Sequence, residues 1–288
     1  MKKSMLTKAL LMIFVLVISA ALAGCGTNSA SSNQASPAAS SAPSATATPT
    51  PKPETAVDAI QKKGTLVIAT GNYYPFEYHD PKTNELVGYD IDLGNMIAKK
   101  LGVKVEWKEM QFQSLIPTLQ NHQADMVIAA MYITDQRKQV IDMSESYMKT
   151  GMSLVRRSDD ASINSLKDIN GKTVGVKSGA TSEKAAQDLN ANNGAKLTIK
   201  AYKDTTDYMT DLQLKRVDVA FNDYLNQLGY NKQHPNAKLE IVGDPFVKAD
   251  LGIGVNKGQT ELVNLVNSVI EDMQKSGEAD QLFSKWLK

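Results

Sequence analysis

Arg137 stands three residues after Thr134, in the segment Ile-Thr-Asp-Gln-Arg. Threonine is a common helix N-cap, and this spacing would place Arg137 in the first helical turn. The helix dipole disfavours a cation there by about 0.3–1 kcal/mol. A bound carboxylate would offset this cost, because it could receive the guanidinium fork and backbone N–H groups together. The spacing therefore indicates a carboxylate-binding site, and the alternative is a surface arginine paired with Asp135 or Asp142.

Asp223 is the second residue whose position indicates chemistry. It follows the apolar segment 217–221, which we expect to be a strand. Sheets of α/β proteins present ligands at the carboxyl ends of their strands, where Asp223 would lie. The alternative is a turn or helix-capping role for Asn222 and Asp223.

Other kinds of chemistry lack the residues that they need. The three histidines, His79, His122 and His234, are not spaced as metal ligands, and a single cysteine excludes disulfides and cysteine-based zinc sites. The segment 171–173 is similar to the end of a phosphate loop, but Leu166 stands where that loop needs its first glycine. We therefore expect no metal, no cofactor and no ATP site.

The first 24 residues have the pattern of a secretory signal peptide. Lys2 and Lys3 precede an uncharged apolar run over 9–21, which is too short for a typical membrane span. The following Leu-Ala-Gly-Cys resembles the lipobox of bacterial lipoproteins, in which the cysteine carries a diacylglycerol. We expect Cys25 to be this lipid-attachment residue, anchoring the protein to the extracytoplasmic face of the cell membrane; the alternative is an incidental thiol.

Residues 25–53 are almost wholly Ser, Ala, Thr, Pro, Asn and Gln, which predicts a disordered tether. Its typical reach would be roughly 30 Å. The whole chain has 42% hydrophobic and 22% charged residues, as globular proteins do. Its formal net charge is +1, and removing the three lysines of the first 24 residues leaves −2. Without a basic excess, nucleic-acid binding lacks its main electrostatic driving force.

The body of the chain, from residue 54 onward, alternates apolar runs with helical patterns. Predicted strands cover 66–69, 103–107, 126–129, 173–176, 196–201 and 217–221. Predicted helices cover 54–63, 88–101, 114–122, 182–189 and 207–214, and a last one has its apolar positions between 262 and 273. We expect Asp90 to cap the second helix. Two successive α/β units of this size predict two lobes.

Several segments together resemble one family. Residues 88–93, 133–137, 165–172 and 176–179 are similar, in the same order, to sequence blocks of the family 3 extracellular solute-binding proteins. These are the polar amino-acid receptors of ABC importers, and the resemblance covers about 56–288.

The resemblance implies an α/β fold of the periplasmic-binding-protein type, a two-lobed clamp with two hinge crossings. Lobe 1 would comprise 54–148 and 246–288, and lobe 2 would comprise 149–245. The implied function is capture of a small zwitterionic solute, an amino acid or a similar molecule, and its delivery to an ABC permease and its ATPase. We expect a monomer and no enzymatic activity.

The resemblance also implies roles for eight ligand-binding residues. Arg137 would hold the ligand's α-carboxylate, Asp223 would accept its ammonium, and Tyr73 and Phe112 would sandwich its aliphatic part. The remaining four contact residues are Lys177, Thr181, Ala130 and Tyr132. Single aromatic residues often belong to a core instead, and a lysine is often solvated, so these alternatives stay open for Tyr73, Phe112 and Lys177.

Two positions depart from the family pattern. Gly71 and Asn72 supply no acid where relatives often carry a second ammonium partner, and Tyr132 replaces a small hydroxyl residue. This favours a bulky or delocalised cation held by ring faces, which gives a compatible-solute (ectoine or betaine) receptor as one alternative. Another is a periplasmic cyclohexadienyl-type dehydratase, for which Glu183 is the one nearby general-acid candidate.

Overall fold

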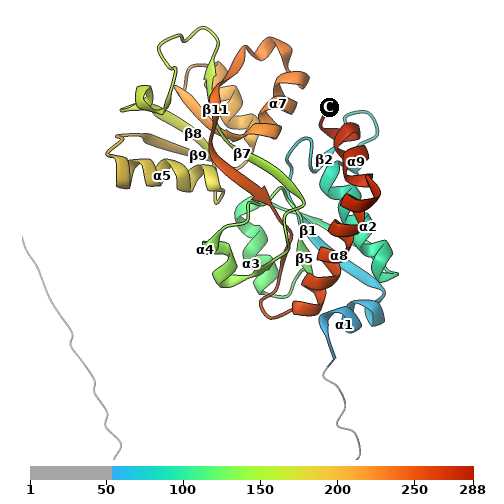
Figure 1. Ribbon diagram of the computed structural model, residues 1–288. Helices are drawn as coiled ribbons and strands as arrows, with labels where there is room; N and C mark the ends of the chain where they lie inside the picture. Colours follow the sequence, from blue (N-terminus) through green and yellow to red (C-terminus); the bar gives the residue numbers. More distant parts are fainter. Residues whose placement is uncertain (1–53) are drawn as a thin grey trace, which may run out of the picture. The chain divides into compact units, whose positions relative to one another are not determined.

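The computed structural model describes residues 54–288, and Figure 1 shows their helices and strands. The predicted signal peptide 1–24, the tether 25–53 and the lipid-attachment residue Cys25 lie outside the described residues. Among the helices of residues 54–288, none combines the length and apolar character that crossing a bilayer requires.

The first lobe is built on a five-stranded sheet of order β4-β1-β5-β12-β6. Its strands are β1 Thr65–Thr70, β4 Lys104–Glu109, β5 Met126–Val127, β6 Asp142–Met143 and β12 Gly254–Val255. β1 runs parallel to β4 and β5, whereas β12 runs antiparallel to β5 and β6. The late segment β12 thus completes a sheet formed from residues that lie more than 100 positions earlier.

Helices cover both faces of this sheet (Figure 1). They are α1 Ala56–Lys63, α2 Tyr89–Leu101, α3 Leu115–Gln120, α4 Asp135–Val140, α8 Thr260–Ser276 and α9 Glu278–Trp286, with a short turn η1 Phe112–Ser114 and a hairpin of β2 Tyr78–His79 and β3 Leu86–Val87. Leu66 and Ile68 of β1 pack with apolar side chains of α2 and α8, whereas Val67 and Ala69 pack with those of α3. Successive strand residues face opposite sides, so the continuous apolar run of β1 is explained by burial on both faces.

The second lobe is built on a sheet of order β11-β7-β10-β8-β9. Its elements are β7 Met148–Arg157, η2 Leu166–Ile169, β8 Thr173–Lys177, α5 Thr181–Asn193, β9 Thr198–Tyr202, α6 Thr205–Gln213, β10 Val219–Asp223, α7 Tyr224–Gln233, η3 Pro235–Ala237 and β11 Leu239–Leu251. β8 is parallel to β9 and β10, and β7 is antiparallel to β10 and β11.

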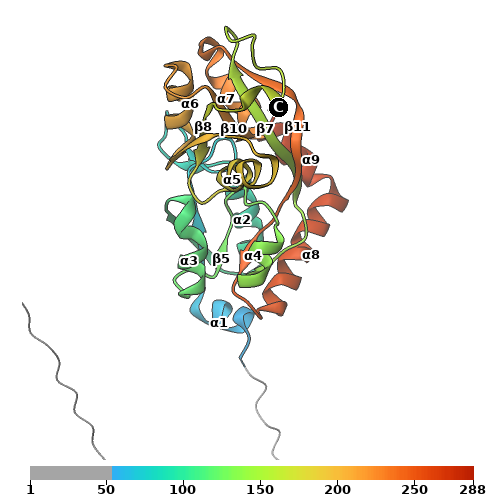
Figure 2. The same ribbon diagram turned by 90° about the vertical axis from the view of Figure 1, so that its left-hand side faces the viewer.

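β7 and β11 form a long antiparallel pair that connects the two sheets, and Figures 1 and 2 both show these strands side by side. The chain leaves the first sheet after β6 to enter β7 and returns from β11 to β12. The predicted two-lobed α/β fold with two crossings is therefore confirmed. The predicted lobe boundaries stay predictions: 148 is the first residue of β7, and 245 lies where the pairing register shifts between Val242 and Val247.

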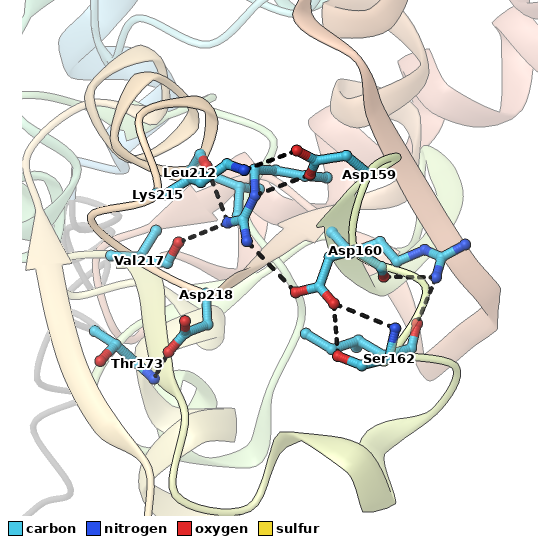
Figure 3. A network of polar contacts seen from close by, with 11 residues as sticks. Asp159, Asp160, Ser162, Thr173, Leu212, Lys215, Val217 and Asp218 are labelled. Carbon is cyan, nitrogen blue, oxygen red and sulfur yellow. Dashed lines mark hydrogen bonds and ion pairs between the residues drawn. The ribbon is translucent and has the colours of Figure 1, made fainter.

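Polar contacts fix the end of β7 to the loop that precedes β10 (Figure 3). The Arg157 guanidinium donates to the carbonyl oxygens of Leu212 and Val217, at 3.2 and 3.1 Å. It also forms an ion pair with Asp160 at 3.4 Å. These contacts hold the start of β10, whose other end carries Asp223.

The second helix begins as predicted, but its capping residue is different. Gly88 occupies the cap position with φ 137°, and Asp90 makes no capping hydrogen bond. The buried Asp90 carboxylate instead accepts hydrogen bonds from the Ala130 N–H at 2.6 Å and the Tyr147 hydroxyl at 3.1 Å. Asp90 therefore joins three separate segments of the first lobe. A Cβ on Gly88 would lie 2.1 Å from the Phe76 carbonyl oxygen, so this position requires glycine.

We expect Gly88→Ala to destabilise the protein far more than Gly102→Ala. Gly102 also has positive φ, at 74°, but a Cβ there meets open space. The Gly102 substitution should therefore lower the free energy of unfolding by about 1–2 kcal/mol, through backbone strain alone. The Gly88 substitution adds a backbone clash and should lower it by at least about 3 kcal/mol. Urea unfolding measures both values, and equal losses would contradict this account of the helix start.

Candidate functional site

A cavity of about 400 Å³ of empty space, its open mouth included, lies between the two lobes. All eight residues predicted to bind ligand line this cavity: Tyr73, Phe112, Ala130, Tyr132, Arg137, Lys177, Thr181 and Asp223. Residues distant in the sequence thus meet at one place, on both sides of the cleft.

Arg137 is a buried cation at this cavity. The Thr134 side chain accepts a hydrogen bond from the Arg137 N–H at 3.2 Å, so the predicted helix cap is present. The Arg137 side chain donates to the Tyr132 carbonyl oxygen at 2.7 Å, and the residue is 8% exposed. It forms no ion pair with any residue of 54–288, and Asp142 pairs with Lys257 instead. The surface-pair alternative is therefore wrong.

Burial lowers the pKa of Arg137 to about 10, because the charged form loses hydration. A buried charge without a counter-ion is costly, and protein interiors normally pair it. Because no described acid is paired with Arg137, the site is suited to an anionic group of a bound molecule.

Asp223 is the last residue of β10 and caps α7, where it accepts a hydrogen bond from the Asn226 N–H at 3.0 Å. Its other carboxylate oxygen accepts hydrogen bonds from the Tyr132 and Thr150 hydroxyls, both at 2.7 Å. Burial raises its pKa, and the hydroxyl and backbone hydrogen bonds oppose that rise. The capping alternative is thus correct, and Asp223 lines the cavity as well.

Thr150 is a contact that sequence reasoning missed. It lies on β7 in a segment without a recognisable motif, and β7 pairs antiparallel with β10 so that Met152 stands opposite Asp223. Only a correct prediction of that strand pairing would have brought Thr150 near the carboxylate.

The two lobes touch each other around the cavity. Side-chain hydrogen bonds join them there, among them Tyr73 to Asn222 at 2.9 Å, Tyr132 to Asp223 at 2.7 Å and Ser178 to Gln113 at 2.8 Å. In each pair one residue belongs to the first lobe and the other to the second. The structure is therefore in a closed arrangement, with side chains of both lobes within reach of one small molecule.

Lys177, at the end of β8, is buried against the aromatic residues of the opposite lobe. Its ammonium lies 4.3 Å from the Tyr73 ring centroid and 5.3 Å from that of Phe112, and the residue is 6% exposed. Burial lowers its pKa, while Glu77 and Asp204 oppose this change. Lys177 is therefore not a solvated lysine, and the rings of Tyr73 and Phe112 face the cavity rather than only a core.

Glu77 is a buried acid that acts electrostatically on Lys177, and sequence reasoning missed it. It is 0% exposed, and neither carboxylate oxygen has a hydrogen-bond partner among the described residues. Gly71 leaves room for it, since a Cβ on Gly71 would lie 3.3 Å from Glu77 Oε1. Burial, and then the nearby Asp90, raises the pKa of Glu77 well above its usual range. An acid inside the apolar segment Tyr-Pro-Phe-Glu-Tyr was the only sequence signal for it.

Glu183, the general-acid candidate, does not line the cavity. Its carboxylate accepts a hydrogen bond from the Gly179 N–H at 2.8 Å. Residues 54–288 also contain no group of three or more His, Cys, Asp or Glu side chains that could hold a metal ion.

Asp90 should make stability depend on pH. Burial raises its pKa to about 7, although the hydrogen bonds from Ala130 and Tyr147 oppose the rise, whereas an unfolded aspartate has a pKa of about 3.9. The folded state then binds the proton more tightly, so this contribution to stability is full below about pH 4 and is lost as the pH rises to about 7. Glu77 should act in the same direction. Asp90→Asn should reduce this decline in the free energy of unfolding, measured by urea unfolding at several pH values.

The matched control is Asp272→Asn, which removes an exposed carboxylate of α8. It should leave the decline between about pH 4 and 7 unchanged. A decline of the same size in the wild type and in Asp90→Asn would contradict the role given to Asp90.

Known proteins with similar sequences bind amino acids. The model of the bacterial extracellular solute-binding proteins, family 3, matches residues 66–288. The L-cystine-binding protein TcyA of Bacillus subtilis (strain 168) is 32% identical over 230 residues, which cover 80% of this chain and 83% of that protein.

Solved structures of amino-acid-binding proteins are also similar to this chain. An ancestral arginine-binding protein bound to arginine matches with a TM-score of 0.74 and 41% identity, over 78% of this chain and 99% of its own. An ancestral amino acid-binding protein described as a precursor of cyclohexadienyl dehydratase matches with a TM-score of 0.73 and 34% identity, over 81% of this chain and 100% of its own. This chain therefore belongs to the bacterial extracellular solute-binding proteins of family 3.

Proposed function

We propose that this protein is the extracytoplasmic receptor of an ABC importer and captures a small zwitterionic α-amino acid between its lobes. The observation that carries the proposal is the buried guanidinium of Arg137, which has no anionic partner among residues 54–288 and borders the same cavity as Asp223. The relatives' names, which include cystine- and arginine-binding proteins, support an amino acid as the ligand.

The two charged residues suit the two ends of a zwitterion. Arg137 would receive the α-carboxylate as a charge-assisted, bidentate pair. Asp223 would accept hydrogen bonds from the α-ammonium, beside the hydroxyls of Tyr132 and Thr150 that already bind it. Because Arg137 belongs to the first lobe and Asp223 to the second, such a ligand has more contacts in the closed form. It therefore shifts the population toward closure.

The free energies of the proposed contacts are large enough for micromolar binding. Micromolar binding requires about −8.2 kcal/mol. Two hydrogen-bonded contacts to charged groups contribute about 1.5–3 kcal/mol each, and burial of the ligand's apolar part between the lobes supplies much of the remainder. The proposed contacts are thus of the right size for an importer's receptor.

Closure would bend the paired strands β7 and β11. They connect the lobes, and their register shifts between Val242 and Val247, which leaves a short stretch without regular pairing. We propose that the hinge lies in this strand pair, with the lobe boundaries near residues 148 and 245.

Two other functions have weaker support. The compatible-solute hypothesis needs free aromatic faces for a ligand cation, but the Lys177 ammonium already lies against Tyr73 and Phe112. The dehydratase alternative needs a general acid in the cleft, and Glu183 is turned toward Gly179. We therefore propose a binding role without catalysis for this cavity.

Arg137→Met should abolish the binding of the α-carboxylate. We expect at least about a 30-fold increase in Kd, because truncating one partner of a buried charge pair costs about 2 kcal/mol or more. Isothermal titration calorimetry with the protein's best-binding amino acid measures this. That ligand's α-carboxamide should bind the wild type weakly and should lose little further affinity in the variant.

The control is Arg216→Met, which removes an exposed arginine that pairs with Asp211 on the second lobe. Its Kd should equal that of the wild type. The proposal is wrong if Arg137→Met, folded by circular dichroism, binds the amino acid as tightly as the wild type.

Anchoring by Cys25 remains part of the proposal, supported by the Leu-Ala-Gly-Cys sequence and the extracellular family. Two or more acyl chains on one protein give stable membrane attachment. In a bacterial host, Cys25→Ser should move the protein from the membrane fraction to the soluble fraction, measured by immunoblotting. Equal membrane fractions for both forms would contradict lipid attachment at this residue.

A further inference from the structure

We propose that Lys177 determines which ligand side chains this receptor accepts. Its ammonium, held between Tyr73 and Phe112, excludes amino acids with cationic side chains and selects those whose side chains end in an acceptor oxygen, a carboxylate or a carboxamide. This inference rests on the proposed function, because it takes the α-carboxylate and α-ammonium of the ligand to bind Arg137 and Asp223.

The position of Lys177 is fixed by the backbone around it. Its N–H donates to the Ser182 hydroxyl and its carbonyl oxygen accepts from the Ala180 N–H, both at 3.1 Å. The next residues approach the opposite lobe, where a Cβ on Gly179 would lie 2.8 Å from the Gln113 Cβ. The lysine side chain therefore leaves a rigid strand end and extends into the cleft beside the cavity.

The Lys177 ammonium lacks hydrogen-bond acceptors. A lysine ammonium has three donors, yet this one forms no hydrogen bond and no ion pair with residues 54–288. The rings of Tyr73 and Phe112 attract it electrostatically but accept no ordinary hydrogen bond. A ligand oxygen at the end of a side chain would supply the missing acceptor inside the cavity.

The charges around the cavity also favour a ligand side chain that ends in an acceptor oxygen. Its lining contains two cations, Arg137 and Lys177, and one carboxylate, Asp223. An α-amino acid backbone pairs with Arg137 and Asp223, which leaves Lys177 as the charge that faces the side chain. A guanidinium or ammonium there would be repelled, and the ring faces that stabilise such a cation are already in contact with Lys177.

Neighbouring acids do not cancel this positive charge. Glu77 and Asp204 both act on Lys177 electrostatically, but neither forms an ion pair with it. Glu77 lies behind Gly71, and Asp204 borders the outer part of the cleft together with Asn72. Neither residue lines the inner cavity, so neither offers a carboxylate to a cationic ligand side chain.

Calorimetry with four amino acids tests the selection. The wild type should bind glutamate and glutamine at least about 10-fold more tightly than arginine and lysine, because the charge-assisted hydrogen bond to Lys177 forms only with the first two. Comparison of glutamate with glutamine shows whether the charged or the neutral oxygen is preferred.

Two substitutions at Lys177 identify its role. Lys177→Met keeps an apolar chain against the rings and removes the charge, so glutamate should lose at least about 10-fold in affinity while arginine binds more tightly. Lys177→Arg keeps the charge and should keep the preference for acceptor oxygens. Lys203→Met, an exposed lysine near the mouth of the cleft, is the matched control and should leave every ratio unchanged.

Failure of this inference differs from failure of the proposed function. If the wild type binds arginine as tightly as glutamate, or if Lys177→Met leaves their ratio unchanged, Lys177 does not select the side chain. The receptor function then still stands, because all four ligands share the same α-carboxylate and α-ammonium. If the folded wild type binds no α-amino acid, the receptor function fails and this inference fails with it.

Discussion

The unpaired burial of the Arg137 guanidinium is the constraint on which the site depends. Protein interiors pair buried charges, because an unpaired one loses its hydration without compensation. Here the guanidinium contacts a backbone carbonyl and no acid, at a cavity that also contains Lys177 and Asp223. A small molecule with complementary charges satisfies all three groups. The missing counter-ion of the buried guanidinium is therefore supplied by the molecule that the protein binds.

The fold and the site share the Asp223 carboxylate. One oxygen accepts the hydrogen bond that caps α7. The other accepts hydrogen bonds from the hydroxyls of Tyr132, in the first lobe, and Thr150, in the second. The same side chain thus caps a helix, forms a hydrogen bond between the lobes and borders the cavity. Because Asn226 and Thr150 belong to the same lobe as Asp223, their hydrogen bonds orient the carboxylate before a ligand ammonium arrives, which reduces the entropy that binding loses.

Local sequence patterns predicted what depends on local interactions. The spacing of Thr134 and Arg137 indicated the helix cap, and the apolar run before Asp223 indicated a strand end at the cleft. The position of Asp90 was misread, because its partner hydroxyl on Tyr147 lies 57 residues away. The orphan carboxyl of Glu77 depends likewise on how distant segments pack together. Such contacts arise from tertiary structure, so residue spacing alone does not reveal them.

The placement of β12 has a consequence for how the protein matures. Residues 254–255 lie inside the first sheet, between strands formed by residues 126–127 and 142–143. The first lobe therefore remains incomplete until residues 254–255 have been synthesised and exported, more than 100 residues after its other strands. Pairing between segments so distant in the sequence slows folding and leaves the edge of β5 open in the meantime. Until β12 pairs with it, this open strand edge favours aggregation of the incompletely folded chain.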